Sequence, residues 1–133
     1  MFIDHLLSQG NAPLLERMVK LTQARHKLIA ENVVNVSTPN YRQKDISVEA
    51  FQAKLRDRVE LRSKSAPNTV GFDDIAIDIE NPNPNIMFHD RNNRSIEQLM
   101  SDQSQNALMH NLMTELLRKQ FGSIQNALKE RVT

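Results

Sequence analysis

The chain has 133 residues, which suits one domain, and a formal net charge of +1, which favours neither nucleic acid nor an anionic membrane as its partner. It contains no cysteine, so disulfides, thiolate metal sites and cysteine catalysis are excluded. Hydrophobic residues make up 39% of the chain and aromatic residues only 5%, which is lean for a compact core and normal for long amphipathic helices.

The N-terminal segment, residues 1–11, is predicted to be loosely ordered in isolation. Ile3, Leu6 and Leu7 allow a brief helix, which Gly10 and Asn11 interrupt. The segment lacks the basic region and the apolar core of a cleaved signal peptide. No stretch approaches the roughly 20 apolar residues that a membrane helix needs, so no direct membrane insertion is expected, and composition alone favours a cytoplasmic protein.

A long amphipathic helix is predicted from about Ala12 to Val36, with Pro13 acceptable in its first turn. Pro39 stops the pattern, because it has no N–H to donate and disfavours helical geometry in the residue before it. Asn40 follows, and asparagine tolerates left-handed backbone better than most residues. The apolar stripe of the helix consists of Leu14, Leu15, Met18, Val19, Leu21, Leu28, Ile29, Val33 and Val36.

The end of this helix carries the most specific pattern in the chain. Its members are Ala30, Asn32, Asn35, Thr38, Pro39 and Tyr41. Taken singly they are ordinary helix-terminus residues. As a string they resemble the N-terminal signature of the flagellar rod, hook and hook-associated axial proteins, Ala-x-Asn-(Ile/Leu)-Ala-Asn-x-x-Thr-Pro-Gly-Tyr. Val34 replaces the usual alanine and adds bulk where helices pack closely, and Asn40 replaces glycine while keeping access to positive φ.

The middle of the chain, residues 40–94, is predicted to be a small irregular or mixed insert. A second helix is expected from Ser47 to Arg62, and the alternation around Ile75–Ile79 predicts a half-buried strand. Loops are expected at residues 63–68 and 81–85. The basic residues of the second helix form either a solvated face or a surface that docks onto an acidic patch, such as residues 73–80 of a neighbouring copy.

A second long helix is predicted from Ser95 to about Arg131, because Ser95 and Gln98 have the spacing of a capping box. Gly122 is the only interruption, and it marks either a kink or a close backbone approach. The apolar seam of this helix is expected to include Leu112, Leu116, Leu117, Phe121 and Ile124.

The predicted architecture is mainly helical. The N- and C-terminal helices form an antiparallel hairpin or coiled coil, and the insert joins them. The chain divides into residues 1–39, 40–94 and 95–133, which together make one structural unit. The helices would be roughly 37 and 55 Å long at 1.5 Å per residue, so part of the longer stripe overhangs and needs cover from other copies or partners.

No arrangement of residues indicates chemistry. The sequence has no glycine-rich phosphate loop, no Gly-x-Ser-x-Gly elbow and no metal-ligand spacing among His5, His26, His89 and His110. We therefore expect no catalytic activity, no metal and no cofactor.

The resemblance implies a structural subunit of the flagellar basal body, most like a short proximal-rod subunit, in a helical tube that transmits torque across the periplasm. It implies copies of the chain itself, other rod proteins, the rod-base adapter protein and the flagellar export apparatus as partners, and export without a cleaved signal. Two alternatives stay open, a different flagellar axial subunit and a cytoplasmic helical adaptor.

Overall fold

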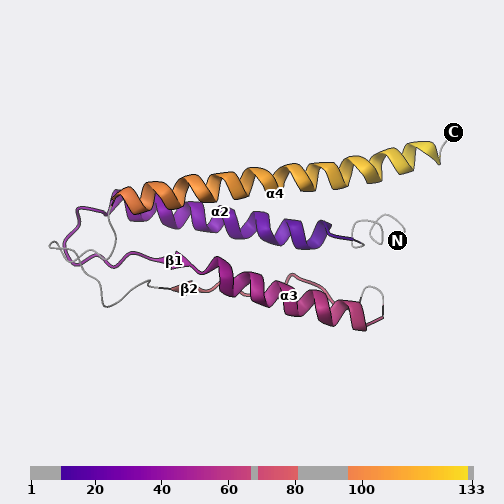
Figure 1. Ribbon diagram of the computed structural model, residues 1–133, viewed down its shortest axis with the longest axis horizontal. Helices are drawn as coiled ribbons and strands as arrows, with labels where there is room; N and C mark the ends of the chain where they lie inside the picture. Colours follow the sequence, from indigo (N-terminus) through magenta and orange to yellow (C-terminus); the bar gives the residue numbers. More distant parts are fainter. Residues whose placement is uncertain (1–9, 67–68, 81–95, 132–133) are drawn as a thin grey trace.

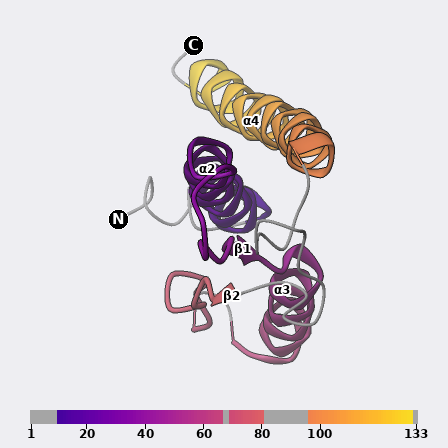
Figure 2. The ribbon, with the colours of Figure 1, turned by 90° about the vertical axis from the view of Figure 1, so that its left-hand side faces the viewer.

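The computed structural model describes residues 10–66, 69–80 and 96–131. In chain order, these residues form α2 (Ala12–Val34), β1 (Asp45–Ile46), α3 (Val48–Lys64), β2 (Ile79–Glu80) and α4 (Ile96–Glu130). α2 and α4 lie side by side and run antiparallel, and α3 with the two short strands lies on the other side of α2 (Figures 1 and 2). The prediction of a mainly helical protein with a long helical hairpin and a small mixed insert is confirmed.

α2 begins at the predicted residue and ends two residues earlier than predicted. Pro13 lies in its first turn, where its missing N–H costs nothing. Asn35 caps the C-terminus, and its backbone N–H donates to the carbonyl of Glu31 at 3.1 Å. Pro39 therefore lies beyond the helix, in a series of turns. Asn40 adopts a φ of 64°, the left-handed conformation that its sequence position suggests.

The insert contains the predicted helix and a much shorter sheet than the sequence suggests. Ser47 caps α3 by accepting a hydrogen bond from the backbone N–H of Ala50 at 3.2 Å. β1 and β2 pair antiparallel, with Ile46 opposite Ile79. Of the strand expected at Ile75–Ile79, only the last residue enters this ladder. The loop expected at residues 81–85 lies outside the described residues.

The hydrophobic core lies mainly between α2 and the insert. Its buried members are Met18, Leu21 and Leu28 of α2, Ile46 of β1, Phe51 and Leu55 of α3, and Phe72 and Ile75. α4 reaches this cluster only through Met109 and Met113, which are partly buried. The inner stripe of α2 therefore serves the insert more than it serves α4.

α4 continues without a break through Gly122. A methyl group added at Gly122 would meet no atom within 4 Å, so a close backbone approach is excluded there. Ser95, the expected cap, lies outside the described residues. Among the helices that the structure describes, none is both long and apolar enough to cross a membrane.

Candidate functional site

Asn32 fastens the chain that returns from the end of α2. Its side chain is 1% exposed and uses both ends of the amide. The Nδ2 group donates to the carbonyl of Lys44 at 2.6 Å, and Oδ1 accepts from the N–H of the same Lys44 at 3.1 Å. The amide therefore pairs with the returning backbone as a neighbouring strand would, just before β1 begins.

Asn35 has a different role, although the sequence places it on a neighbouring position of the same helix. Its Nδ2 group donates to the carbonyl of Glu31 at 2.9 Å, and its Oδ1 accepts from the hydroxyl of Thr38 at 3.3 Å. The backbone N–H of Thr38 donates to the carbonyl of Asn35, and that of Tyr41 to the carbonyl of Thr38. Asn35 and Thr38 thus stabilise the turns that follow α2. Asn32 binds the backbone of Lys44, where the chain comes back alongside the helix.

The remaining residues of the pattern lie on the outside of this turn. Ala30 and Pro39 are exposed, and Tyr41 is half-buried. Val34, the departure from the family's alanine, is 81% exposed. Its added bulk therefore faces solvent, where it is available to a neighbouring molecule.

A buried ion pair, which the sequence analysis missed, also fastens β1 to α2. Arg25 donates from Nε to Oδ1 of Asp45 at 2.9 Å and from Nη2 to Oδ2 at 3.1 Å. The hydrogen bond to Asp45 raises the pKa of Arg25, against the opposing effect of burial. No spacing rule links two residues twenty positions apart across a turn, so the sequence offered no signal for this pair.

The contact between α2 and α4 is partly polar. The Nδ2 group of Asn106 donates to the carbonyl of Thr22 at 2.9 Å, and the hydroxyl of Thr22 lies 2.8 Å from Nδ1 of His110. Asp102 is also buried on α4, and it accepts from Nε2 of Gln98 at 3.2 Å. The contacts of Thr22 with Asn106 and His110 fix which turn of α4 faces which turn of α2.

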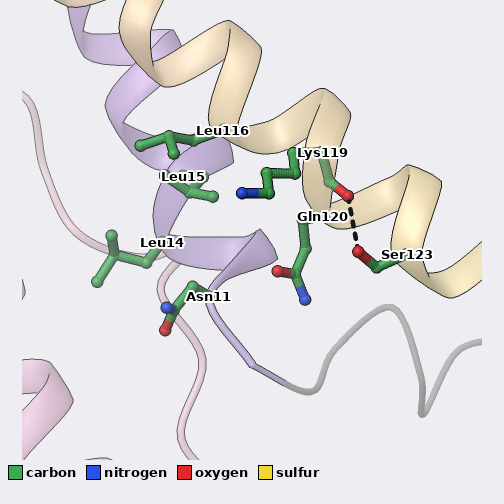
Figure 3. A pocket seen from close by; sticks show the side chains of 7 residues that line it. All are labelled: Asn11, Leu14, Leu15, Leu116, Lys119, Gln120 and Ser123. Atoms are coloured by element: carbon green, nitrogen blue, oxygen red, sulfur yellow. Dashed lines mark hydrogen bonds between the residues drawn. The ribbon is translucent and has the colours of Figure 1, made fainter.

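The five predicted seam residues do not form one row on α4. Leu112 continues an outer row that starts at Leu108, with a spacing of four residues, whereas Leu116 lies beside Leu15 of α2 in a cavity between the two helices (Figure 3). Leu108, Leu112 and Leu116 are 73%, 53% and 41% exposed. Leu117 and Ile124 are half-buried and follow the spacing of Leu99, Asn106 and Met113, which face α2, whereas Phe121 is 37% exposed.

A metal-binding cluster is not found in the part of the chain that the structure describes. No group of three or more histidine, cysteine, aspartate or glutamate residues is arranged there to hold an ion. His26 is exposed, and His110 is engaged with Thr22.

Comparison with known proteins supports the resemblance carried by the Ala30–Tyr41 pattern. No protein-family profile matches the chain. The chain is 27% identical to the flagellar basal body rod protein FlgB of Borrelia hermsii, over 87% of this chain and 93% of the relative. It is also 27% identical to FlgB of Borreliella burgdorferi, over 85% of this chain and 91% of the relative. The FlgB of Aquifex aeolicus is 24% identical, over 89% and 92%. The chain therefore resembles FlgB-type flagellar basal-body rod proteins along most of its length, as its N-terminal pattern predicted.

Proposed function

We propose that this chain is a structural subunit of the bacterial flagellar basal-body rod, of the FlgB type. The observation that carries the proposal is the similarity to three FlgB proteins over 85–89% of the chain. Similarity of this extent covers the helical hairpin and the insert together. The proposed role is assembly and support, and it requires no catalytic group.

The outer row of α4 is the surface that we assign to contacts between subunits. Leu108 and Leu112 are 73% and 53% exposed and lie about one helical turn apart. Such a row of exposed leucines is costly in water and is typical of a helix that packs against another molecule. Val34, also exposed, adds a second apolar position at the end of α2.

Repetition of one such contact builds a tube. When two different surfaces of identical or similar subunits meet, and the rotation between them does not close a ring, the result is an open helical assembly. In this proposal the assembly transmits torque across the periplasm. Its partners are other copies of the chain, other rod proteins, the rod-base adapter protein and the export apparatus, which exports the chain without cleaving a signal.

The test replaces Leu108 and Leu112 by glutamate in the full chain. Both side chains are exposed, so the isolated variant should unfold within about 1 kcal/mol of the parent. Its self-association, measured by sedimentation, should be lost, as should swimming of cells that carry it as their only copy. The matched control is Ser104→Glu with Gln125→Glu, two exposed polar positions on α4, which should retain both properties.

Either of two results would remove the proposal. One is wild-type swimming and self-association by the Leu108/Leu112 variant. The other is a parent protein that never self-associates and instead binds one partner in a fixed ratio, which is the behaviour of a helical adaptor.

A further inference from the structure

A cavity opens on one side of the contact between α2 and α4. Its volume is about 240 Å³. The residues that line it carry imidazole rings, carboxamides and one methyl group, namely Gln23, His26, Asn106, Ala107, His110 and Asn111. Two of the four histidines of the chain therefore meet at one cavity, although they lie on different helices.

The hydrogen bonds around His110 determine which of its ring nitrogens carries the proton. The hydroxyl of Thr22 donates its single hydrogen to the carbonyl of Val19 at 2.9 Å. It can therefore only accept from Nδ1 of His110, which lies 2.8 Å away, so Nδ1 carries the hydrogen. Nε2 is then left with a lone pair. Histidines that bind metal ions are usually held in this way, with one nitrogen donating to the protein and the other facing the ion.

Asn106 adds a buried acceptor without a partner among the described residues. Its side chain is 2% exposed, and its Nδ2 group donates to the carbonyl of Thr22. Its Oδ1 is buried and accepts no hydrogen bond from the part of the chain that the structure describes. A buried oxygen of this kind is costly unless a donor reaches it, so the cavity favours an occupant that brings a hydrogen-bond donor.

The two histidines lean toward each other across the cavity. Thr22 contacts both Asn106 and His110 of the antiparallel helix α4. His26 is one turn further along α2, so it lies level with a turn of α4 about six residues before His110. At 1.5 Å per residue, the two backbones are offset by about 9 Å along the helices. Side chains of a helix lean toward its N-terminus, and in antiparallel helices these two therefore lean into the space between them.

We propose that this cavity binds a divalent transition-metal ion such as Zn²⁺ through His26 and Nε2 of His110. Imidazole nitrogens bind zinc at about 2.0–2.1 Å. Water fills the remaining coordination positions, and one such water donates to Oδ1 of Asn106. No carboxylate is among the residues that line the cavity, so the site favours ions that prefer nitrogen ligands over Mg²⁺ and Ca²⁺. The bound ion joins α2 to α4 within one molecule.

The sequence analysis expected no metal, because no spacing rule links two histidines on different helices. The proposal goes beyond the rod function and does not depend on it.

Zinc titration of the full chain tests the proposal, with calorimetry to count the ions and thermal unfolding to measure stabilisation. ZnCl₂ should bind as one ion per chain and raise the melting temperature, because the ion binds the folded pairing of the helices. MgCl₂ should do neither. His26→Gln should weaken zinc binding about tenfold or more and remove the rise in melting temperature. His26 is exposed, so this variant should fold like the parent.

A second variant and a matched control complete the experiment. His110→Gln removes the other ligand and should also weaken zinc binding about tenfold or more. Because His110 contacts Thr22, its melting temperature with zinc is compared with that of the same variant without zinc. His5→Gln combined with His89→Gln removes the other two histidines and should retain the one bound ion and its stabilisation.

Four outcomes would overturn the proposal. The first is a parent chain that binds no zinc. The second is equal zinc affinity in the parent and His26→Gln. The third is unchanged affinity in His110→Gln, which would leave a single surface histidine as the ligand. The fourth is loss of binding in the His5/His89 variant, which would place the ion elsewhere on the chain. In each case the proposed rod function would stand, because its own test changes Leu108 and Leu112.

Discussion

Asn32 offers a donor and an acceptor in one planar amide, and both bind the backbone of Lys44. The geometry requires asparagine. Aspartate lacks the donor, leucine lacks both groups, and glutamine is one methylene too long for the same approach from the helix. Because the amide is buried, water does not replace either bond at low cost.

Asn32→Ala should therefore lower the free energy of unfolding by about 2 kcal/mol, through loss of two buried hydrogen bonds and a small void. Chemical denaturation followed by circular dichroism measures the change. Asn35→Ala is the matched control, since Asn35 bonds only within the exposed exit turn, and it should cost less than about 1 kcal/mol. Equal losses of unfolding free energy in the two variants would contradict the prediction that the hydrogen bonds to Lys44 contribute more than those of Asn35.

α4 shows how a helix can be long without being uniformly buried. Its first half meets α2 through Leu99, Asp102 and Asn106, and the same half exposes Leu108 and Leu112 on another side. Gly122 lies in the second half, where neither packing nor backbone conformation requires glycine.

Gly122→Ala should stabilise the protein by up to about 1 kcal/mol, because alanine restricts the unfolded chain and favours the helix. Gly10 provides the opposite case. It adopts a φ of +73° beside Gln120, so Gly10→Ala should destabilise the protein by about 1 kcal/mol. Thermal unfolding of the two variants should show a raised melting temperature for Gly122→Ala and a lowered one for Gly10→Ala. A destabilised Gly122 variant would mean that the glycine serves a contact outside the monomer.

The long elements were predictable, whereas the partner of each element was not. The apolar periodicity and Pro39 placed the described helix ends within two residues of their observed positions. β1 is two residues long and carries no period, so it left no signal. Asp102 and Asn106 look like surface residues in the sequence, yet they are buried against α2. The apolar stripe of a helix also does not reveal which element will pack against it. For that reason the core between α2 and the insert was not predicted.

Within the insert, ion pairs as well as the hydrophobic core hold α3 against the segment that precedes β2. Arg58 of α3 donates to both carboxylate oxygens of Asp74, at 2.6 and 3.1 Å, and to the carbonyl of Gly71. Lys54 donates from Nζ to one carboxylate oxygen of Asp78, Oδ2. The segment from Gly71 to Asp78 is thereby held along α3, with Phe72 and Ile75 turned into the core.

The Arg58–Asp74 pair makes a small part of the stability depend on pH. The hydrogen bond from Arg58 lowers the pKa of Asp74 below its ordinary value of 3.8. Folding thus favours the ionised carboxylate, and the contribution is present above pH 3.8 and lost as the pH falls through the lowered pKa. Asp74→Asn should therefore be less stable than the parent at neutral pH and nearly equal to it in strong acid.

Denaturant titrations across that pH range measure the difference. Asp73→Asn is the control, since Asp73 makes no ion pair with any described residue, and it should follow the parent at every pH. A constant difference between the Asp74 variant and the parent at all pH values would contradict the linkage.

The polar contact between Thr22, Asn106 and His110 also has a mechanical consequence. Two helices joined only by leucines can slip by one turn, about 5.4 Å, and repack in similar surroundings. Here such a slip would take the buried Nδ2 group of Asn106 away from its acceptor, the carbonyl of Thr22, at a cost of about 1–3 kcal/mol. The polar contact of Thr22 with Asn106 and His110 therefore opposes sliding of the two helices along each other. A force applied along α4 is transmitted to α2 through it.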